Sequence, residues 1–186
     1  MDPTPVLEWL QRTSAAVQIR DSLFTFPVLE SIHVVGLALV FGTIAILDLR
    51  LLGVASTDRP VSRLMADLLK WTWAAFALTA LTGGLMFSTN ALVYFHNTFF
   101  RAKMLLLVLA ALNMLVFELT ARKTLGRWDA GARTPPIAKV VATMSILIWV
   151  GVIVAGRAIG FTATRTTVPT DSQPDVNFED LLGLPK

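Results

Sequence analysis

Four long apolar runs are the feature that most constrains how this chain can fold. They lie near residues 27–49, 68–89, 99–120 and 138–161, and each is longer than the roughly 20 residues that a helix needs to cross the hydrocarbon core of a bilayer. Hydrophobic residues make up 54% of the chain and charged residues only 16%, a balance far from that of an ordinary soluble domain. The sequence therefore predicts an all-α integral membrane protein with a four-helix bundle.

The segments on either side of these runs differ in character from the bundle. Residues 1–26 lack the basic start and apolar core of a signal peptide, and their weak apolar stripe predicts a short interfacial helix. Residues 162–186 are rich in threonine, proline and acidic residues without a sustained period, which predicts an extended C-terminal tail. We therefore expect three parts: an N-terminal segment over 1–26, a membrane domain over 27–161 and a tail over 162–186.

Basic residues between the runs predict the orientation. The connections after the first and third runs together hold nine of them: Arg50, Arg59, Arg63, Lys70, Arg122, Lys123, Arg127, Arg133 and Lys139. Loops rich in lysine and arginine stay in the cytoplasm. Both termini are therefore expected outside, in a multi-pass protein of a bacterial inner (plasma) membrane.

Composition also excludes several classes of function. The chain has no cysteine, which excludes disulfides, cysteine-ligated zinc, iron–sulfur clusters and covalently attached haem. The net charge of +3 is small and scattered, so nucleic acid is not an expected partner. No G-x-S-x-G, HExxH, P-loop or GxGxxG motif occurs, which argues against classical hydrolytic enzymes.

A layer of ionisable residues is expected near the outer face. Glu30 and His33 are three residues apart, so they share a helix face, and a rise of 1.5 Å per residue places them within roughly 10 Å of the outer boundary. The same level should hold Arg101, Lys103 and Arg157, with His96 in the loop just above. Ionisable groups inside a membrane are costly, so this layer is a candidate site.

The leading hypothesis for this layer is a haem site. Two histidines are the minimum for bis-imidazole ligation of a non-covalent haem b, so His33 and His96 are the candidate ligands to the iron. Arg101, Lys103 and Arg157 would meet the propionates, and Glu30 would orient a histidine. This predicts an electron-transfer subunit, with a quinone or a redox protein as its partner.

Structural interpretations of the same residues stay open. Each histidine can be an interfacial or hydrogen-bonded residue, and Arg101 and Lys103 can extend to lipid headgroups. Glu30 and Arg157 can form an ion pair that neutralises both charges. Small residues can serve helix packing or leave room for a flat macrocycle: Gly36, Gly42, Gly83 and Gly84.

Two other functions stay open as well. Met86 and Met104 are expected in the layer of His33 and His96, and thioether with imidazole suits Cu(I), which favours copper handling or the transport of small solutes. The other alternative is a non-redox subunit that assembles with itself or with a larger membrane complex through its glycine-bearing faces.

Polar residues elsewhere are interpreted as structural. Asp48 and Arg50 should anchor the inner end of the first helix or lock it to the next loop. Asn113 should join two helices, and Glu118 should pair with Arg122 one turn later. Tryptophans at the inner face should form an aromatic belt: Trp71, Trp73 and Trp128.

Three stretches carry a resemblance to a known family. The runs FPVLESIHVVGLALVFGTIAILDLRLLG, NTFFRAKMLLLVLAALN and GRAIGF resemble the DUF6644 family of small bacterial four-helix membrane proteins. The resemblance covers nearly the whole chain and implies the four-span architecture without an assigned reaction. More distantly, the early histidine followed by small residues is similar to cytochrome b561-like and CopD-like membrane proteins. Because the chain has only two histidines, that likeness allows at most one bis-histidine haem.

Overall fold

A computed structural model describes residues 3–129 and 134–166 of the chain. Within these residues every regular element is a helix, in the order α1 (Thr4–Gln11), α2 (Ser14–Asp21), α3 (Thr25–Leu52), α4 (Val61–Thr89), α5 (Ala91–His96), α6 (Thr98–Leu119), the 3₁₀ helix η1 (Arg122–Arg127) and α7 (Pro136–Thr166). Four helical segments in this part of the chain are long and apolar enough to cross a membrane: α3, α4, α6 continued through η1, and α7. The predicted all-α fold with four spans is confirmed.

The long helices extend past the predicted apolar runs. Helix α3 continues to Leu52 and stops at Gly53, whose φ of 79° is a left-handed conformation that glycine adopts without strain. Helix α4 begins at Val61 instead of near residue 68, directly after Pro60. Its first two turns carry exposed polar residues, so hydropathy alone did not mark them as part of the helix.

The N-terminal segment forms two short helices, where one interfacial helix was expected. Helix α1 ends at Gln11, and Thr13 begins α2 by accepting a hydrogen bond from the backbone N–H of Ala16. Threonine favours this capping role over a position inside a helix, which explains the break. The predicted tail lies almost wholly outside the described residues, and α7 continues through its first few positions to Thr166.

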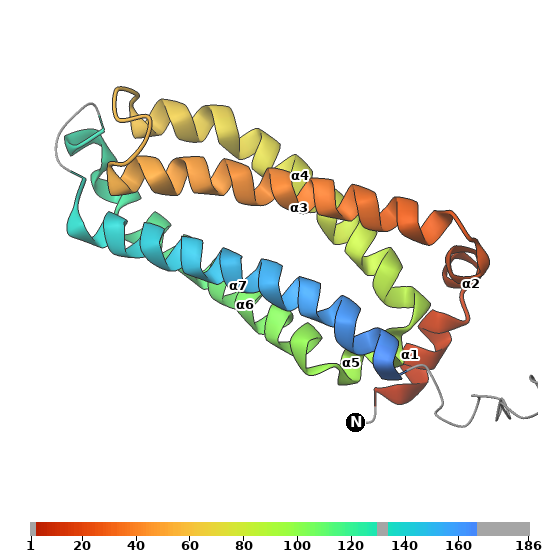
Figure 1. Ribbon diagram of the computed structural model, residues 1–186. Coiled ribbons are helices and arrows are strands. Elements are labelled where there is room, and N and C mark those ends of the chain that lie inside the picture. Colours follow the sequence, from red (N-terminus) through yellow and green to blue (C-terminus); the bar gives the residue numbers. More distant parts are fainter. Residues whose placement is uncertain (1–2, 130–133, 167–186) are drawn as a thin grey trace, which may run out of the picture.

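The bundle consists of two helix pairs, as Figure 1 shows. Helix α3 packs along α4, α6 packs along α7, and contacts between α3 and α7 join the pairs. Helices α1, α2 and α5 lie together at one end of the bundle, called here the α5 end. The connection over 53–60 and η1 lie at the opposite end, called here the η1 end.

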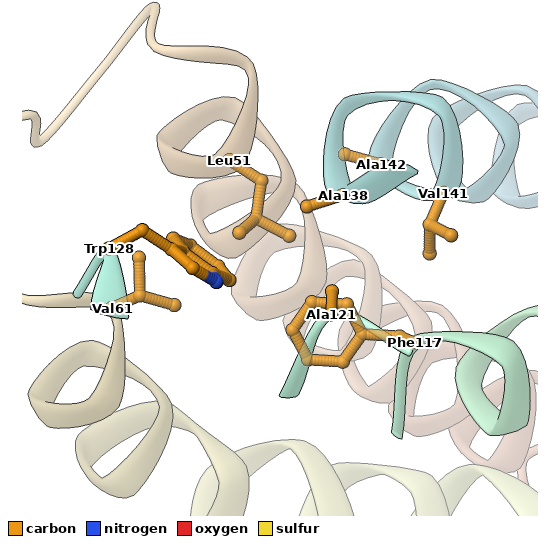
Figure 2. Close-up of a cluster of buried hydrophobic side chains, with 8 residues drawn as sticks. All are labelled: Leu51, Val61, Phe117, Ala121, Trp128, Ala138, Val141 and Ala142. Atoms are coloured by element: carbon orange, nitrogen blue, oxygen red, sulfur yellow. The ribbon is translucent and has the colours of Figure 1, made fainter. Parts of the chain in front are cut away.

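Two buried clusters hold the pairs together. One lies at the η1 end and combines side chains of all four long helices and the segment after η1, as Figure 2 shows: Leu51, Val61, Phe117, Ala121, Trp128, Ala138, Val141 and Ala142. The second lies further along the bundle and consists of Val40, Ala75, Trp149 and Val152. Both clusters include residues of α3 and α7, so the contact between those two helices is the centre of the fold.

Trp128 corrects a prediction, because it is not part of an aromatic belt. Its side chain is 5% exposed and packs in the cluster at the η1 end. Trp71 and Trp73, by contrast, are 65% and 54% exposed on α4. The turn after η1 folds the Trp128 side chain back between the helix ends. The position of Trp128 after an apolar run does not predict this change of direction.

Hydrogen bonds link the connections at the η1 end. The Arg50 Nε donates to the backbone oxygen of Arg59 over 2.8 Å, which confirms the predicted lock between the first long helix and the next loop. Asp129 accepts hydrogen bonds from the backbone N–H and the hydroxyl of Ser62. Because Ser62 lies in the first turn of α4, this carboxylate caps a helix that is distant in the sequence.

Candidate functional site

His33 lies on the face of α3 that packs against α4. Its Nδ1 is 3.0 Å from the Thr82 Oγ1, and a Cβ added at Gly83 would be 2.9 Å from its Cε1. The imidazole therefore fills the space that the missing side chain of Gly83 leaves on α4. Gly36 permits a second close approach of the same helices, because a Cβ there would meet the Thr79 Oγ1 at 2.5 Å.

The Thr82 hydroxyl lies within hydrogen-bond distance of the His33 Nδ1 and of two backbone oxygens of its own helix, those of Leu78 at 2.8 Å and Thr79 at 3.2 Å. When its single hydrogen goes to one of these backbone oxygens, the hydroxyl accepts from the His33 Nδ1. In that tautomer a neutral His33 has its lone pair on Nε2.

Lys103, another predicted site residue, lies on α6 against α7. A Cβ added at Gly156 would lie 3.8 Å from the Lys103 Nζ. The side chain is half-buried, so Lys103 packs between the two helices of one pair.

His96 has a different environment from His33. It ends the short helix α5, where a loop was expected, and its side chain is exposed. Its Nδ1 lies 2.9 Å from the backbone oxygen of Leu92 in the same helix, and its ring meets Phe95 edge to face. Among the described residues the two histidines share neither a hydrogen bond nor a ring contact, and no three histidine, aspartate or glutamate side chains gather as a metal site would need.

The remaining predicted site residues are exposed. Arg157 lies over the ring of Phe161, 5.1 Å from its centroid, and Arg101 is exposed on α6. Glu30 is exposed as well, and the ion pairs within the described residues do not include a pair between Glu30 and Arg157. The predicted ion pair is therefore wrong, because the arginine turns to an aromatic ring at the end of its own helix.

Glu30 instead acts on Tyr94 of α5. Burial raises the pKa of the Tyr94 phenol, and the negative charge of Glu30 raises it further. Tyr94 also belongs to an aromatic cluster with Phe87 and Phe100, in which Phe87 stacks on Phe100 at 5.1 Å between ring centroids. This cluster joins α4 to α6 at the α5 end of the bundle.

Away from this cluster, α4 and α6 separate and leave a cavity. Its volume is about 380 Å³, and side chains of α3, α4, α6 and α7 line it. Trp73 and Phe76 of α4 and Ala111 and Met114 of α6 line it and are also exposed on the outside of the bundle. The cavity therefore opens sideways between α4 and α6, toward the bilayer.

Most of the cavity wall is apolar, with a few polar groups from all four long helices. Asp48 of α3 is 5% exposed, and its Oδ2 has no hydrogen-bond partner among the described residues. Ser145 of α7 is buried and lines the same cavity. The Asn113 Nδ2 of α6 donates to the backbone oxygen of Val141 over 3.0 Å, which confirms its predicted role between helices.

Sequence reasoning missed this cavity. It treated Asp48 as an anchor and Asn113 as helix-joining, and each was judged alone. The signal that was present is their depth: both are polar residues within spans, on the side of the membrane predicted for the nine basic loop residues. Polar residues at one depth on two spans indicate a shared interior.

The comparisons with known proteins give a family and no relative of established activity. No curated protein and no solved structure matches the chain, so the similarity to cytochrome b561-like and CopD-like proteins finds no support. Residues 15–162 match the sequence profile of a family of unknown function, DUF6644. That match includes all of α3, α4, α5 and α6 and most of α7. The chain therefore belongs to the DUF6644 family.

Proposed function

We propose that this membrane protein binds a hydrophobic small molecule, which it takes up from the bilayer into the cavity between its helix pairs. The observation that carries this proposal is the sideways opening of a cavity of about 380 Å³. This volume lies within the range of about 300–1,000 Å³ found for pockets that hold small molecules. A lipid-soluble molecule could enter it without crossing the polar membrane surface.

The packing around the cavity supports a preformed site. The buried cluster with Leu51 and Phe117 closes it toward the η1 end, and the cluster with Val40 and Trp149 closes it on the other side, because these four side chains also line the cavity. Both clusters depend on contacts between α3 and α7. Helices α4 and α6, the other member of each pair, lie on the two sides of the opening.

The test is binding of the neutral, apolar dye N-phenyl-1-naphthylamine to the protein in neutral detergent, followed by its fluorescence. Wild type should bind one dye per chain. Ala111→Trp should abolish binding, because the indole would fill the opening on α6. Ala80→Trp is the matched control, since Ala80 is exposed on α4 and does not line the cavity. Equal binding by both variants would exclude the cavity as the binding site.

Electron transfer through a haem b is a second candidate function, favoured by the orientation of His33. A histidine held through Nδ1 with a lone pair on Nε2 is the usual arrangement of a metal-ligating imidazole, so His33 fits an axial ligand. The cation of Lys103 would then be placed to meet a propionate. His96 would have to exchange its bond with Leu92 for a bond to the iron.

An absorption spectrum of the purified protein with and without dithionite tests this candidate. A reducible Soret band that His33→Ala removes and Val34→Leu retains would support ligation by His33. Loss of the six-coordinate spectrum in His96→Ala would identify the second ligand. Bound copper without haem would favour the copper alternative, and a colourless, metal-free protein from haem-sufficient cells would exclude both and leave a non-redox subunit.

A further inference from the structure

The cavity contains a buried acidic group that forms no ion pair with the described residues. Asp48 is buried, lines the cavity, and has one carboxylate oxygen without a hydrogen-bond partner in the described residues. Ser145, which lines the cavity with Asp48, is neutral, and no ion pair of the described residues includes Asp48. An ionised carboxylate in apolar surroundings is stable only when a cation or several donors compensate it.

Two cationic side chains at this end of the bundle, those of Arg50 and Arg122, have other partners. Arg50 directs its Nε to the backbone oxygen of Arg59, and Arg122 pairs with Glu118. Among the described residues that line the cavity, none is a lysine or an arginine, and the two charged ones, Asp48 and Glu118, are both acidic. In an empty cavity the carboxyl group of Asp48 is stable in its neutral form. When Asp48 is ionised, the matching positive charge has to come from a molecule inside the cavity, because no cationic side chain lines it.

The other walls suit an organic cation as well. Trp73, Phe76 and Trp149 line the cavity, and aromatic faces attract organic cations, with tryptophan the strongest of them. Asn113 donates one amide hydrogen to the backbone oxygen of Val141, which leaves its oxygen as an acceptor and its second amide hydrogen as a donor. The wall thus offers an acceptor to a ligand in addition to the carboxyl group of Asp48.

We propose that the cavity selects a lipophilic organic cation, with Asp48 as its counter-ion and the aromatic side chains around its apolar groups. This inference rests on the proposed function, because it assigns the class of molecule that the cavity binds. The apolar cavity wall favours a ligand with a hydrophobic surface. The one buried carboxyl group that lacks a cationic partner favours a ligand with a single positive charge.

Two ions of the same size and shape and of opposite charge test the proposal: tetraphenylphosphonium and tetraphenylborate. Calorimetric titration of wild type in neutral detergent, with matched micelle blanks, should show at least tenfold tighter binding of the phosphonium. Asp48→Asn should lower the affinity for the phosphonium by tenfold or more and leave binding of neutral N-phenyl-1-naphthylamine unchanged. Asp67→Asn, the same change at an exposed position of α4 outside the cavity, should affect neither.

The outcomes separate this inference from the proposed function. Retained dye binding by Asp48→Asn shows that the variant is folded, so an unchanged phosphonium affinity in that variant would overturn the role of Asp48. Equal affinity of wild type for the two ions would overturn cation selectivity even if Asp48→Asn does not fold. In both of these cases the proposed function would still hold if wild type binds the dye and Ala111→Trp does not. If wild type binds neither the dye nor either ion, both the proposed function and this inference are wrong.

Discussion

The imidazole of His33 lies directly against Gly83, where an added Cβ would approach the His33 Cε1 to 2.9 Å. The adjacent Gly84 has open space around the position of its missing Cβ. Two neighbouring glycines on α4 therefore differ in function, and only the first provides room for a side chain of another helix. This difference allows a test in which the substitution is the same and only the position changes.

Gly83→Ala should destabilise the protein by about 1–3 kcal/mol, the usual cost of an added carbon in a packed interior, because the new methyl group displaces the ring that Thr82 holds. Gly84→Ala should be neutral or slightly stabilising, since alanine is the better helix former. Thermal unfolding in detergent, with histidine NMR spectra as a local measure, would check both. Equal changes in stability for the two variants would show that the His33 ring does not pack against Gly83.

Glu30→Gln and Arg157→Gln should act independently. Arg157 lies over Phe161 and Glu30 acts on Tyr94, so the two charges have separate surroundings. The change in stability of the double variant should equal the sum of the single changes within about 0.5 kcal/mol. A double-mutant cycle measures this directly, and a coupling energy above 1 kcal/mol would restore the ion pair that the sequence suggested.

The bond between Asp129 and Ser62 should make stability depend on pH. Hydrogen bonds from the Ser62 hydroxyl and then the Ser62 backbone N–H hold the pKa of Asp129 below its ordinary value. The contribution is therefore complete above the unfolded pKa of about 3.9 and is lost as the pH falls through the lower folded pKa. Asp129→Ala should cost at most about 1 kcal/mol at pH 7, because water reaches this carboxylate.

Melting temperatures at pH 7 and near pH 3 would test the sign. The difference between wild type and Asp129→Ala should shrink as the pH is lowered. Asp58→Ala removes an exposed carboxylate at the same end of the bundle that forms no ion pair among the described residues, and it should have no effect at pH 7. A difference that grows on acidification would contradict the assigned role of Asp129.

The orientation can be tested because the chain has no cysteine of its own. Ser14 lies at the α5 end and Thr57 at the η1 end, and both are exposed. If loops rich in basic residues are cytoplasmic, Ser14→Cys should react with a membrane-impermeant maleimide in intact cells and Thr57→Cys should react only after lysis. The reverse labelling pattern would show the opposite orientation in the membrane, with His33 near the cytoplasmic face.

The fold was largely predictable because span length and local spacing are properties of one segment at a time. Four apolar runs of membrane-crossing length predicted four long helices, and a spacing of four residues predicted the pair of Glu118 and Arg122 that forms. Boundaries were less accurate where a helix continues into polar residues. Nothing in the apolar pattern indicates that α4 starts at Val61.

The candidate sites were less predictable because they depend on how helices rotate against one another. Depth in the membrane placed His33 and His96 in one layer, but depth does not give the direction in which a side chain points. His33 faces α4, whereas His96 bonds to the helix that carries it. The cavity depends on the separation of α4 from α6. This separation results from how all four long helices pack together, so the sequence of one apolar run does not predict it.

The pairing of helices also has a consequence for how the chain assembles during synthesis. Helices α3 and α4 are consecutive spans that pack on each other, and so are α6 and α7. Each pair can form as a hairpin soon after its second span enters the bilayer, as the two-stage view of membrane folding expects. Asp48 arrives with the first hairpin and Ser145 with the last span. The carboxyl group of Asp48 therefore enters the bilayer before α6 and α7, which line the same cavity, and it is enclosed only when the second hairpin packs against the first.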